Sequence, residues 1–271
     1  MNTAIICSLE DPAGRTIKKQ LLELGFSETK DHFDADSIYE RNGVRLITVT
    51  EGLLDQNNID QKIIADLIIF ASRHRSLEGK PSFTCHAPGN WGPAEFGGVP
   101  SKLCKTSALA LRSMLMLLKK HAAHTGHEVT LEVTHHGPYI ETPCLFVELG
   151  STEKEWANAE YARVVAVTIL DFLDHPNTDQ CQIAVALGGT HYAPNIVKCI
   201  ERAGIATSHV CPKHALQHLS KDMLRQSIEK TKEHVDFVLV DWKGLGGEKA
   251  RIKDMLAELN LEWKRTDKTG A

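Results

Sequence analysis

Short apolar runs and longer amphipathic stretches alternate along most of the chain. The apolar runs predict buried strands at residues 3–8, 67–71, 82–86, 129–134, 144–149, 182–187, 207–211 and 237–242. Apolar residues at helical spacing predict helices at residues 17–24, 101–124, 154–173, 219–231 and 248–259, and a further helix that begins near Asn195. The pair Asn42-Gly43 predicts a hairpin over residues 39–49. Strands that alternate with long helices favour a three-layer α/β/α sandwich with a mostly parallel mixed sheet, which we expect to form one domain over residues 1–271.

The segment over residues 134–156 carries the densest set of polar groups in this pattern. It begins at the end of a predicted strand, continues with His135-His136, and turns at Gly137-Pro138. A second strand leads into Gly150-Ser151-Thr152, where Ser151 or Thr152 is expected to cap the next helix. Two strand ends and a helix start therefore converge here, and ligands of open α/β sheets bind at such places.

Histidines stand at or near the ends of four predicted strands. They are His86, the pair His135-His136, His191 and His209. Imidazoles combined with a carboxylate suit zinc, and the carboxylates that could join them are Glu95, Glu141, Glu148 and Asp241. Adjacent residues on a strand point to opposite faces, so we expect one histidine of the pair to be functional and the other structural. The remaining histidines, His74 among them, mostly stand next to charged residues and are expected to be solvated.

Two glycine-containing loops admit phosphate or oxyanion binding, because each follows a strand and precedes a helix. They are Gly150-Ser151-Thr152 and Gly188-Gly189-Thr190. The chain has neither a GxGxxG nor a GxxxxGK[ST] motif, which argues against a dinucleotide or an ATP site. It has no GxSxG motif either, which argues against a serine α/β-hydrolase.

Composition limits the setting in which this chemistry operates. The 271 residues are 42% hydrophobic, which is enough for a substantial core, and no apolar run approaches the length of a membrane span. Seven cysteines without a CxxC spacing fit reduced thiols, so we expect a soluble cytoplasmic protein. The net charge of −4 argues against a generally basic surface for nucleic acids and leaves room only for a local basic patch.

Four motifs together resemble a known family along nearly the whole chain. They are CHAPGNWGPAEFGG (85–98), HHGP (135–138), VELGSTEKEW (147–156) and GGTHYAP (188–194). In this order they resemble the archaeal and plant type of D-aminoacyl-tRNA deacylase. The resemblance implies hydrolysis of the ester between a D-amino acid and the 3′ end of tRNA, with zinc as cofactor, on a phosphorylase/hydrolase-like α/β/α fold.

The resemblance and the strand-end pattern together give a set of candidate site residues. The candidates for catalysis are His135, His136, Glu148 and Thr152. The candidates for metal binding are His86, His135 and His191. The candidates for substrate binding are Asn90, Gly150, Ser151, Gly188, Gly189, Tyr192 and Lys213. The tRNA acceptor end is expected to meet a restricted basic surface on a monomer, formed by Lys102, Lys105, Lys213, Lys249, Arg251 and Lys253.

Two alternatives belong to other classes of function. One is a zinc-dependent amidohydrolase or exopeptidase that acts on small acyl or peptide substrates. The other is a non-enzymatic RNA- or nucleotide-binding module in which the histidines are structural. Hydrolysis of D-aminoacyl-tRNA without hydrolysis of peptides, and metal analysis of the protein, separate these alternatives from the deacylase.

Overall fold

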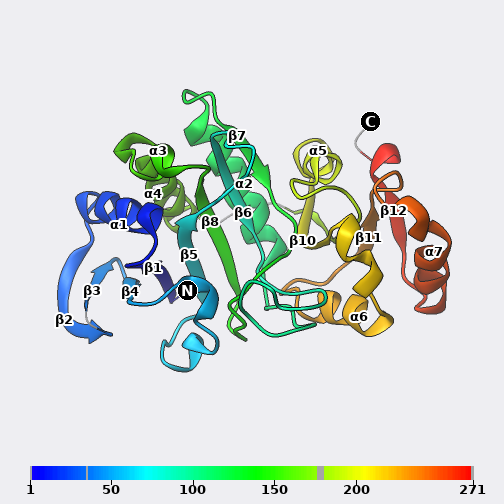
Figure 1. Ribbon diagram of the computed structural model, residues 1–271, viewed down its shortest axis with the longest axis horizontal. Helices are drawn as coiled ribbons and strands as arrows, with labels where there is room; N and C mark the ends of the chain where they lie inside the picture. Colours follow the sequence, from blue (N-terminus) through cyan, green and yellow to red (C-terminus); the bar gives the residue numbers. More distant parts are fainter. Residues whose placement is uncertain (1, 35, 176–179, 270–271) are drawn as a thin grey trace.

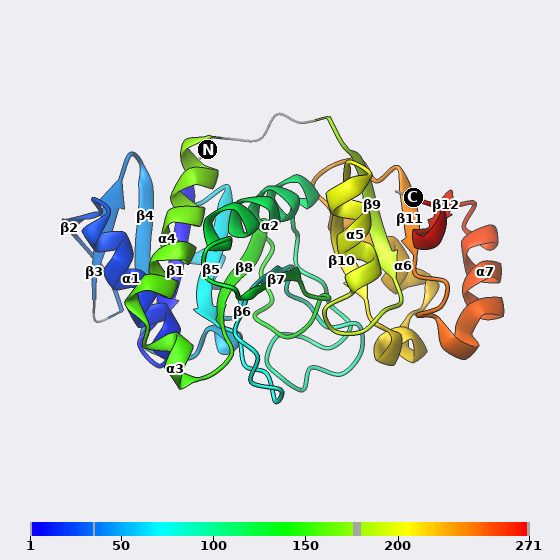
Figure 2. The same cartoon turned by 90° about the horizontal axis from the view of Figure 1, so that it is seen from above.

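Two β-sheets organise the structure, a computed structural model that describes residues 2–34, 36–175 and 180–269 (Figures 1 and 2). In these residues the large sheet has the strand order β2-β3-β4-β1-β5-β8-β6-β7 and the small sheet has the order β10-β9-β11-β12. The strands of the large sheet are β1 (Thr3–Ser8), β2 (Ser27–Phe33), β3 (Asp36–Arg41), β4 (Val44–Val49), β5 (Leu67–Arg73), β6 (Ser82–His86), β7 (Glu128–Leu131) and β8 (Cys144–Gly150). Those of the small sheet are β9 (Gln182–Leu187), β10 (Ile205–Cys211), β11 (Phe237–Val240) and β12 (Trp263–Arg265).

Most neighbouring strands run parallel. The small sheet is parallel throughout, and β4, β1, β5 and β8 form a parallel block in the large sheet. The antiparallel pairs are β2 with β3, β3 with β4, and β6 with β8. The predicted mixed, mostly parallel sheet and the hairpin over residues 39–49 are therefore confirmed, whereas the division into two sheets was not predicted.

Seven α-helices in the described residues cover the sheets. They are α1 (Pro12–Glu23), α2 (Ala108–Ala122), α3 (Glu153–Trp156), α4 (Ala159–Asp174), α5 (Pro194–Arg202), α6 (Lys221–Glu229) and α7 (Lys249–Glu258). The apolar sides of α1, α2 and α4 pack with Ile69, Leu145 and Val147 on one face of the large sheet. On the opposite face, Phe70 and Phe146 pack against loop residues such as Leu53 and Ile140. A cleft opens on this loop-covered face, and both Phe146 and polar side chains such as Glu148 line it.

Side-chain capping explains why two of the predicted helices differ from the observed ones. The helix predicted from residue 101 begins at Ala108, because the Ser107 hydroxyl accepts a hydrogen bond from the Ala110 amide at 3.1 Å and caps it there. The helix predicted over 154–173 is divided into α3 and α4. Asn158 accepts from the amides of Glu160 and Tyr161 and so begins a new helix.

Among the described residues, every helix is too short or too polar to cross a lipid bilayer.

Candidate functional site

The centre of the site is a row of polar side chains across three strands of the large sheet. Glu148 on β8 lies opposite Ser72 on β5 and Thr84 on β6. The Ser72 hydroxyl donates to Glu148 Oε1 at 2.7 Å, and the Thr84 hydroxyl donates to Oε2 at 3.4 Å. Glu148 is only 4% exposed, so this carboxylate is fixed in a buried position by hydroxyl donors on both sides.

A second buried carboxylate, Glu132, faces Glu148 across an imidazole. His74 follows β5, and its Nδ1 lies 3.0 Å from Glu132 Oε1 and 3.5 Å from Glu148 Oε2. Burial lowers the pKa of His74, but the two carboxylates outweigh burial and raise this pKa to about 11. His74 is therefore an imidazolium at neutral pH. Its Nε2–H group donates to the Tyr192 hydroxyl at 2.9 Å.

His74 in turn helps to keep both carboxylates ionised. Burial raises the pKa of Glu132, but contacts with His191 and His74 outweigh burial and hold this pKa well below its usual range. Burial likewise raises the pKa of Glu148, but its contacts with His74 and His86 outweigh burial and lower this pKa. Two buried carboxylates against one imidazolium leave a negative charge that favours a further cation beside them.

Three imidazoles meet next to Glu148, at the end of β6 and in the segment after β7. The ring of His86 lies 4.3 Å from that of His135 and 4.7 Å from that of His136, measured between centroids. Each Nδ1 is close to a backbone carbonyl: that of Ala87 for His86, Val133 for His135 and Gly137 for His136. A carbonyl only accepts hydrogen bonds, so in the neutral form of each ring Nδ1 carries the proton and Nε2 keeps its lone pair.

The three imidazoles differ in their protonation. Burial is the main cause that lowers the pKa of His135 well below its usual range and that of His136 to about 4, so both are neutral at neutral pH. Burial also lowers the pKa of His86, but Glu148 outweighs this and raises it. His86 Nε2 has no hydrogen-bond partner within the described residues, and its distance to Glu148 Oε1 is 3.8 Å. This position therefore favours a positive charge.

His191 comes to the site from the other sheet, on the loop between β9 and α5. Its Nε2–H group donates to Glu132 Oε2 at 2.5 Å, and its ring lies 4.7 Å from that of His135. The His191 side chain is 44% exposed, whereas that of Glu132 is fully buried. A buried carboxylate thus orients an imidazole that solvent can reach, which is the arrangement of an oriented general base.

We refer to His74, His86, Glu132, His135, His136, Glu148 and His191 as the histidine–glutamate cluster. It contains three overlapping groups whose ligand atoms are close enough to hold a metal ion: His86, His135 and His136; Glu132, His135 and His191; and His74, Glu132 and Glu148. Most of the cluster lines a cleft of about 700 Å³. Leu54, Leu77 and Phe96 contribute apolar side chains to this cleft, and Arg73 and Arg75 contribute charged ones.

Comparison with known proteins identifies the family of this chain. A family model described as D-aminoacyl-tRNA deacylase matches residues 61–264. The D-aminoacyl-tRNA deacylase of Pyrococcus furiosus is 36% identical over 263 residues, covering 93% of this chain and 96% of the relative. That of Thermococcus kodakarensis is 37% identical over 265 residues, covering 94% and 96%. The chain belongs to the D-aminoacyl-tRNA deacylase family.

A solved structure is similar to this chain over nearly its whole length. A crystal structure of the conserved protein AF0625, described as having unknown function, superposes with a TM-score of 0.90 at 31% identity, over 99% of this chain and 96% of that one. The family resemblance and the α/β fold expected from the sequence are both confirmed. The matched region, residues 61–264, includes every member of the histidine–glutamate cluster.

The metal triad expected from the sequence, His86, His135 and His191, is not one of the three observed groups. His86 and His191 belong to different groups, and His135 is common to both. His136 lies beside His86 as well, because its backbone is left-handed (φ 45°) and the pair stands beyond the end of β7. The strand rule that assigned the adjacent histidines to opposite faces therefore does not apply, and both belong to the cluster.

Other candidate residues have structural contacts of their own. Asn90 is buried, and its Nδ2 donates to the Gly97 carbonyl at 2.9 Å. The Ser151 hydroxyl donates to the Lys80 carbonyl at 2.6 Å. Gly150 packs against His74, since a Cβ atom there would lie 2.8 Å from His74 Cδ2.

Thr152, a candidate for catalysis, caps α3 in a reciprocal capping box. Its side chain accepts from the Lys154 amide, and Glu155 Oε2 accepts both from the Thr152 hydroxyl at 2.6 Å and from its amide at 3.0 Å. We expect Thr152→Ala to lower the free energy of unfolding by about 1 kcal/mol and to leave kcat unchanged. Denaturant unfolding and a deacylation assay measure the two effects. Thr152→Ser, which keeps the cap, is the control, and a large loss of kcat in Thr152→Ala would support the catalytic role expected from the sequence.

The remaining candidates lie along the small sheet. Gly188 and Gly189 have positive φ angles of 93° and 95° and begin the loop that carries His191 and Tyr192. The Lys213 amide donates to the Gly189 carbonyl at 3.0 Å. His209 is fully buried on β10, where its Nδ1 lies 3.3 Å from the Thr134 hydroxyl, and it belongs to none of the three groups of described residues that could hold a metal ion. His209 therefore lies outside the histidine–glutamate cluster, although its position near a strand end predicted a shared site.

Two members of the cluster were not found from the sequence. His74 was expected to be solvated, but it is 4% exposed because its ring packs beside the buried carboxylates of Glu132 and Glu148, whereas its neighbours Arg73 and Arg75 are exposed. Glu132 was not among the candidate carboxylates. A signal existed for Glu132, because it is the one charged residue inside the predicted strand over 129–134, directly before the histidine pair.

Proposed function

We propose that the histidine–glutamate cluster is the active site at which this member of the D-aminoacyl-tRNA deacylase family hydrolyses the ester bond between a D-amino acid and the 3′ end of tRNA. The observation that carries this proposal is the Glu132–His191 pair, in which a fully buried carboxylate holds an exposed imidazole at the edge of a cleft. Aminoacyl esters are already activated, so hydrolysis needs a positioned water, a base and stabilisation of the oxyanion.

His191 would act as the general base. Its Nε2–H group donates to Glu132, so its Nδ1 is the basic nitrogen of the neutral ring. Glu132 fixes the orientation of the ring and stabilises the imidazolium that forms when His191 takes a proton from water. His74 acts as a positioning residue, because it makes ionic contacts with Glu132 and Glu148 and binds Tyr192 from the same loop as His191.

A metal ion fits the imidazole group formed by His86, His135 and His136. Backbone carbonyls hold each Nδ1, as outer partners of metal-bound histidines do, and leave each Nε2 as a ligand atom. Among the described residues, Nε2 of buried His86 has no hydrogen-bond partner and lies 3.8 Å from Glu148 Oε1, which favours a cation at this place. Three nitrogen ligands suit zinc, which when bound polarises a carbonyl and lowers the pKa of a water molecule.

The apolar rim of the cleft would receive the D-aminoacyl group or the terminal base. Leu77 is fully exposed and Phe96 is 67% exposed, which leaves both free to cover a ligand. Phe96 lies in the glycine-rich loop that follows His86, and its carbonyl accepts from the Gly137 amide at 2.9 Å, next to the histidine pair. This bond connects the apolar rim to the segment that carries the imidazoles.

Phe96→Ala is expected to raise KM for D-Tyr-tRNA by about 5- to 10-fold, because a bound apolar surface loses its contact with the ring. The value of kcat should stay within about twofold, since the cluster itself is unchanged. Steady-state kinetics measure both constants. Met116→Ala, on the exposed side of α2, removes a similar exposed side chain and should change neither. An unchanged KM in Phe96→Ala would exclude this side chain from substrate binding.

We also propose that residues 1–271 act as a single catalytic unit and that a monomer suffices. Glu132 and His74 directly follow β7 and β5 of the large sheet, whereas His191 and Tyr192 come from the loop after β9 of the small sheet. The cluster is therefore complete within one chain. Light scattering of the active protein measures the number of chains.

The experiment that tests the proposed function compares three substrates. D-Tyr-tRNA should be hydrolysed much faster than L-Tyr-tRNA, and N-acyl amino acids or dipeptides should not be hydrolysed. Hydrolysis of the small substrates without deacylation would instead favour a zinc-dependent amidohydrolase or exopeptidase. Binding of tRNA with no hydrolysis of any substrate would favour an RNA-binding module.

A further inference from the structure

The small sheet has a reversal of strand order at its centre. Its order β10-β9-β11-β12 means that the chain moves from β9 to one side for β10 and then crosses back to the other side for β11. Ile196 and Ile200 of α5 pack with Ala184 and Ala186 on one face of the sheet. Side chains of α6 and α7, such as Leu224 and Ile252, pack with Val185 and Leu187 on the other face. The connections beside β9 and β11 therefore lead to opposite faces of the sheet, and ligands of parallel sheets bind at the carboxyl ends of the strands at such a point.

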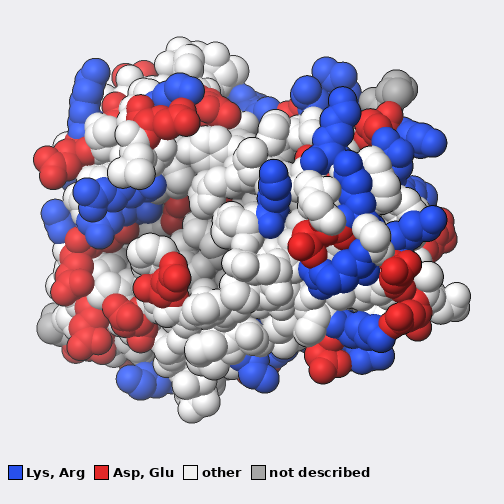
Figure 3. Space-filling view, turned by 45° about the vertical axis from the view of Figure 1, so that its right-hand side comes forward, with Lys and Arg blue, Asp and Glu red and all other residues white. Residues whose placement is uncertain are grey.

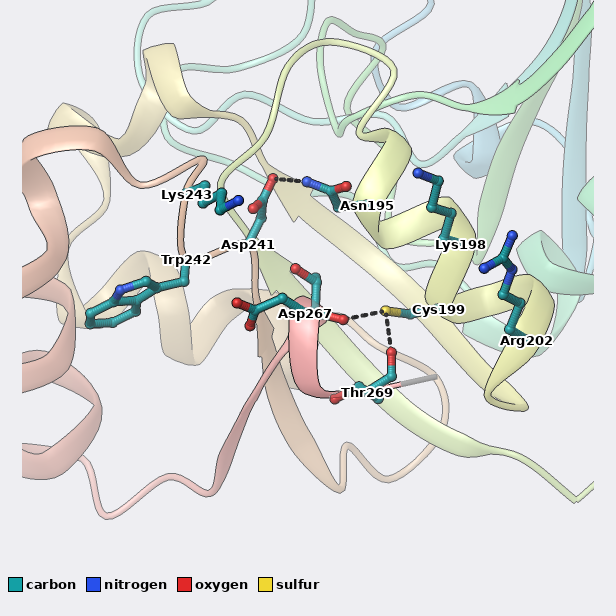
Figure 4. A pocket seen from close by; sticks show the side chains of 10 residues that line it. Asn195, Lys198, Cys199, Arg202, Asp241, Trp242, Lys243, Asp267 and Thr269 are labelled. Atoms are coloured by element: carbon teal, nitrogen blue, oxygen red, sulfur yellow. Dashed lines mark hydrogen bonds between the residues drawn. The ribbon is translucent and has the colours of Figure 1, made fainter. Parts of the chain in front are cut away.

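A pocket of about 230 Å³ lies at this reversal. Figure 4 shows that it is bordered on one side by α5 and on the other by the segment after β11. Asn195, Lys198 and Arg202 line it from α5, and Asp241, Trp242 and Lys243 line it from the segment after β11. We call it the switch-point pocket. It is distinct from the cleft at the histidine–glutamate cluster, because the two share no lining residue.

The walls of the switch-point pocket are held in place. Asp241 is 5% exposed, and its carboxylate accepts from Asn195 Nδ2 at 3.1 Å and from the Gly244 amide at 3.2 Å. The loops after β9 and β11 touch through their backbones, since a Cβ atom on Gly244 would lie 2.3 Å from the Gly189 amide nitrogen. A ligand therefore enters a preformed site and does not have to order these loops.

Positive charge dominates the part of this pocket that a ligand can reach. Lys198, Arg202 and Lys243 are exposed and form no ion pair with any residue in the described part of the chain. Asp267 also lines the pocket, but Arg265 neutralises it at 2.5 Å. Lys198 and Arg202 are one helical turn apart on α5, opposite Lys243 (Figure 4). This arrangement attracts an anionic group.

The surface next to the pocket extends the basic character and adds aromatic rings. Trp242 stacks on Trp263 with 5.9 Å between centroids, and Lys249 and Arg265 lie over the Trp242 ring at 5.8 Å and 5.3 Å. Figure 3 shows many Lys and Arg side chains on the right-hand half of the face it displays, with Asp and Glu side chains among them. Basic groups interleaved with aromatic rings are typical of surfaces that bind single-stranded RNA.

One short loop connects this pocket to the proposed active site. The loop over residues 188–193 carries His191 and Tyr192 into the histidine–glutamate cluster, and Asn195, at the start of α5, lines the switch-point pocket. A Cβ atom added to Gly189 would lie 3.6 Å from Asp241 Oδ2, so this loop also passes close to a wall of the pocket. This short segment therefore leads from the histidine–glutamate cluster to a wall of the switch-point pocket.

On this basis, and resting on the proposed function, we propose that the switch-point pocket binds the phosphate backbone of the single-stranded tRNA acceptor end upstream of the aminoacylated nucleotide. Lys198, Arg202 and Lys243 contact the phosphates, and Asp241 holds the two walls together. This assignment differs from the basic surface expected from the sequence. Arg251 of that surface donates to the Leu219 carbonyl at 2.8 Å and also bonds the Leu216 carbonyl, so it is committed to internal contacts.

The test replaces the three cations together. Lys198→Gln/Arg202→Gln/Lys243→Gln should raise the dissociation constant of uncharged tRNA by about 10-fold or more at low salt and lower the slope of log K against log salt by about 2. KM for D-Tyr-tRNA should rise by a similar factor, with kcat unchanged. The control Lys19→Gln/Lys30→Gln/Lys62→Gln removes equal charge from exposed residues in the part of the chain that forms the large sheet. It should change binding by less than about twofold.

A small substrate separates this inference from the proposed function. 2′(3′)-O-D-tyrosyl-adenosine has the ester but no phosphate, so the triple variant should hydrolyse it at the wild-type rate, which also shows that the variant is folded. Wild-type affinity and salt dependence of tRNA binding in the triple variant would overturn the switch-point pocket as an RNA site, whatever the activity. Failure of the wild type to hydrolyse either ester would instead overturn the proposed function, while the binding measurement would still report on the pocket.

Discussion

His191→Ala is expected to lower kcat for D-Tyr-tRNA deacylation by about 10²- to 10⁴-fold, the usual contribution of a positioned general base. Without the imidazole, water at the cleft has no group that takes its proton, although the cleft and its rim remain intact. The side chain is 44% exposed, so its loss should leave the fold and KM nearly unchanged. Single-turnover rates at saturating enzyme measure the chemical step directly.

Glu132→Gln is the matched variant for the orienting role of the carboxylate. An amide keeps the shape of the side chain but removes the negative charge that stabilises the imidazolium, so we expect a loss of comparable size to that of His191→Ala. Because the two residues act as a unit, the double variant should lose little more than either single variant. His124→Ala changes an exposed histidine on the segment after α2 and is the control. Wild-type rates in His191→Ala would show that another group is the base.

The second large effect concerns the metal. We expect the purified protein to bind about one zinc ion per chain, and His86→Ala, His135→Ala and His136→Ala each to lose most of this zinc together with activity. His191→Ala should keep its zinc, because His191 lies outside the imidazole group. Metal analysis after dialysis measures the zinc content of each protein. Chelation should abolish the activity of the wild type, and addition of zinc should restore it.

The comparison of His136→Ala with His191→Ala distinguishes the proposed metal ligands, which include His136, from the triad expected from the sequence, which includes His191. If His191→Ala lost zinc and His136→Ala retained it, the ion would instead be bound by a set that contains His191. Retention of zinc in His86→Ala would then indicate Glu132, His135 and His191, and its loss would indicate the triad expected from the sequence. Full activity in a protein shown to be free of metal would contradict the role of zinc altogether. His86 is fully buried, so its replacement can destabilise the fold. Circular dichroism of each variant therefore checks that the protein is folded.

Much of the fold could be predicted from the sequence, because apolar runs bounded by glycine or polar residues determine where buried strands lie. The strands β1, β6 and β9 have the predicted bounds, and the Asn42-Gly43 turn joins β3 to β4. The exposed strand β2 could not be predicted, because its sequence SETKDHF contains no apolar run and it is held by its backbone pairing with β3. Local patterns also could not show that β9 to β12 form a separate sheet.

The site was predictable in part for a related reason. Histidine at a strand end is visible locally, so His86, the pair His135-His136 and His191 could be named. Their grouping depends on which strands are neighbours: β6 is antiparallel to β8, and this pairing brings His86 beside Phe146 and close to Glu148. His74 could not be recognised as buried, since its burial depends on two carboxylates from β8 and from the segment after β7.

The central claim is that the ester of D-aminoacyl-tRNA is cleaved at the histidine–glutamate cluster. A crystal structure of the protein with 3′-deoxy-3′-(D-tyrosylamino)adenosine, in which an amide replaces the labile ester, tests this claim most directly. We expect the amide carbonyl to lie in the cleft between His191 and the imidazoles of His135 and His136, with the tyrosyl ring or the adenine against Phe96. Binding of this ligand at saturating concentration only outside the cleft, with the cluster untouched, would contradict the claim.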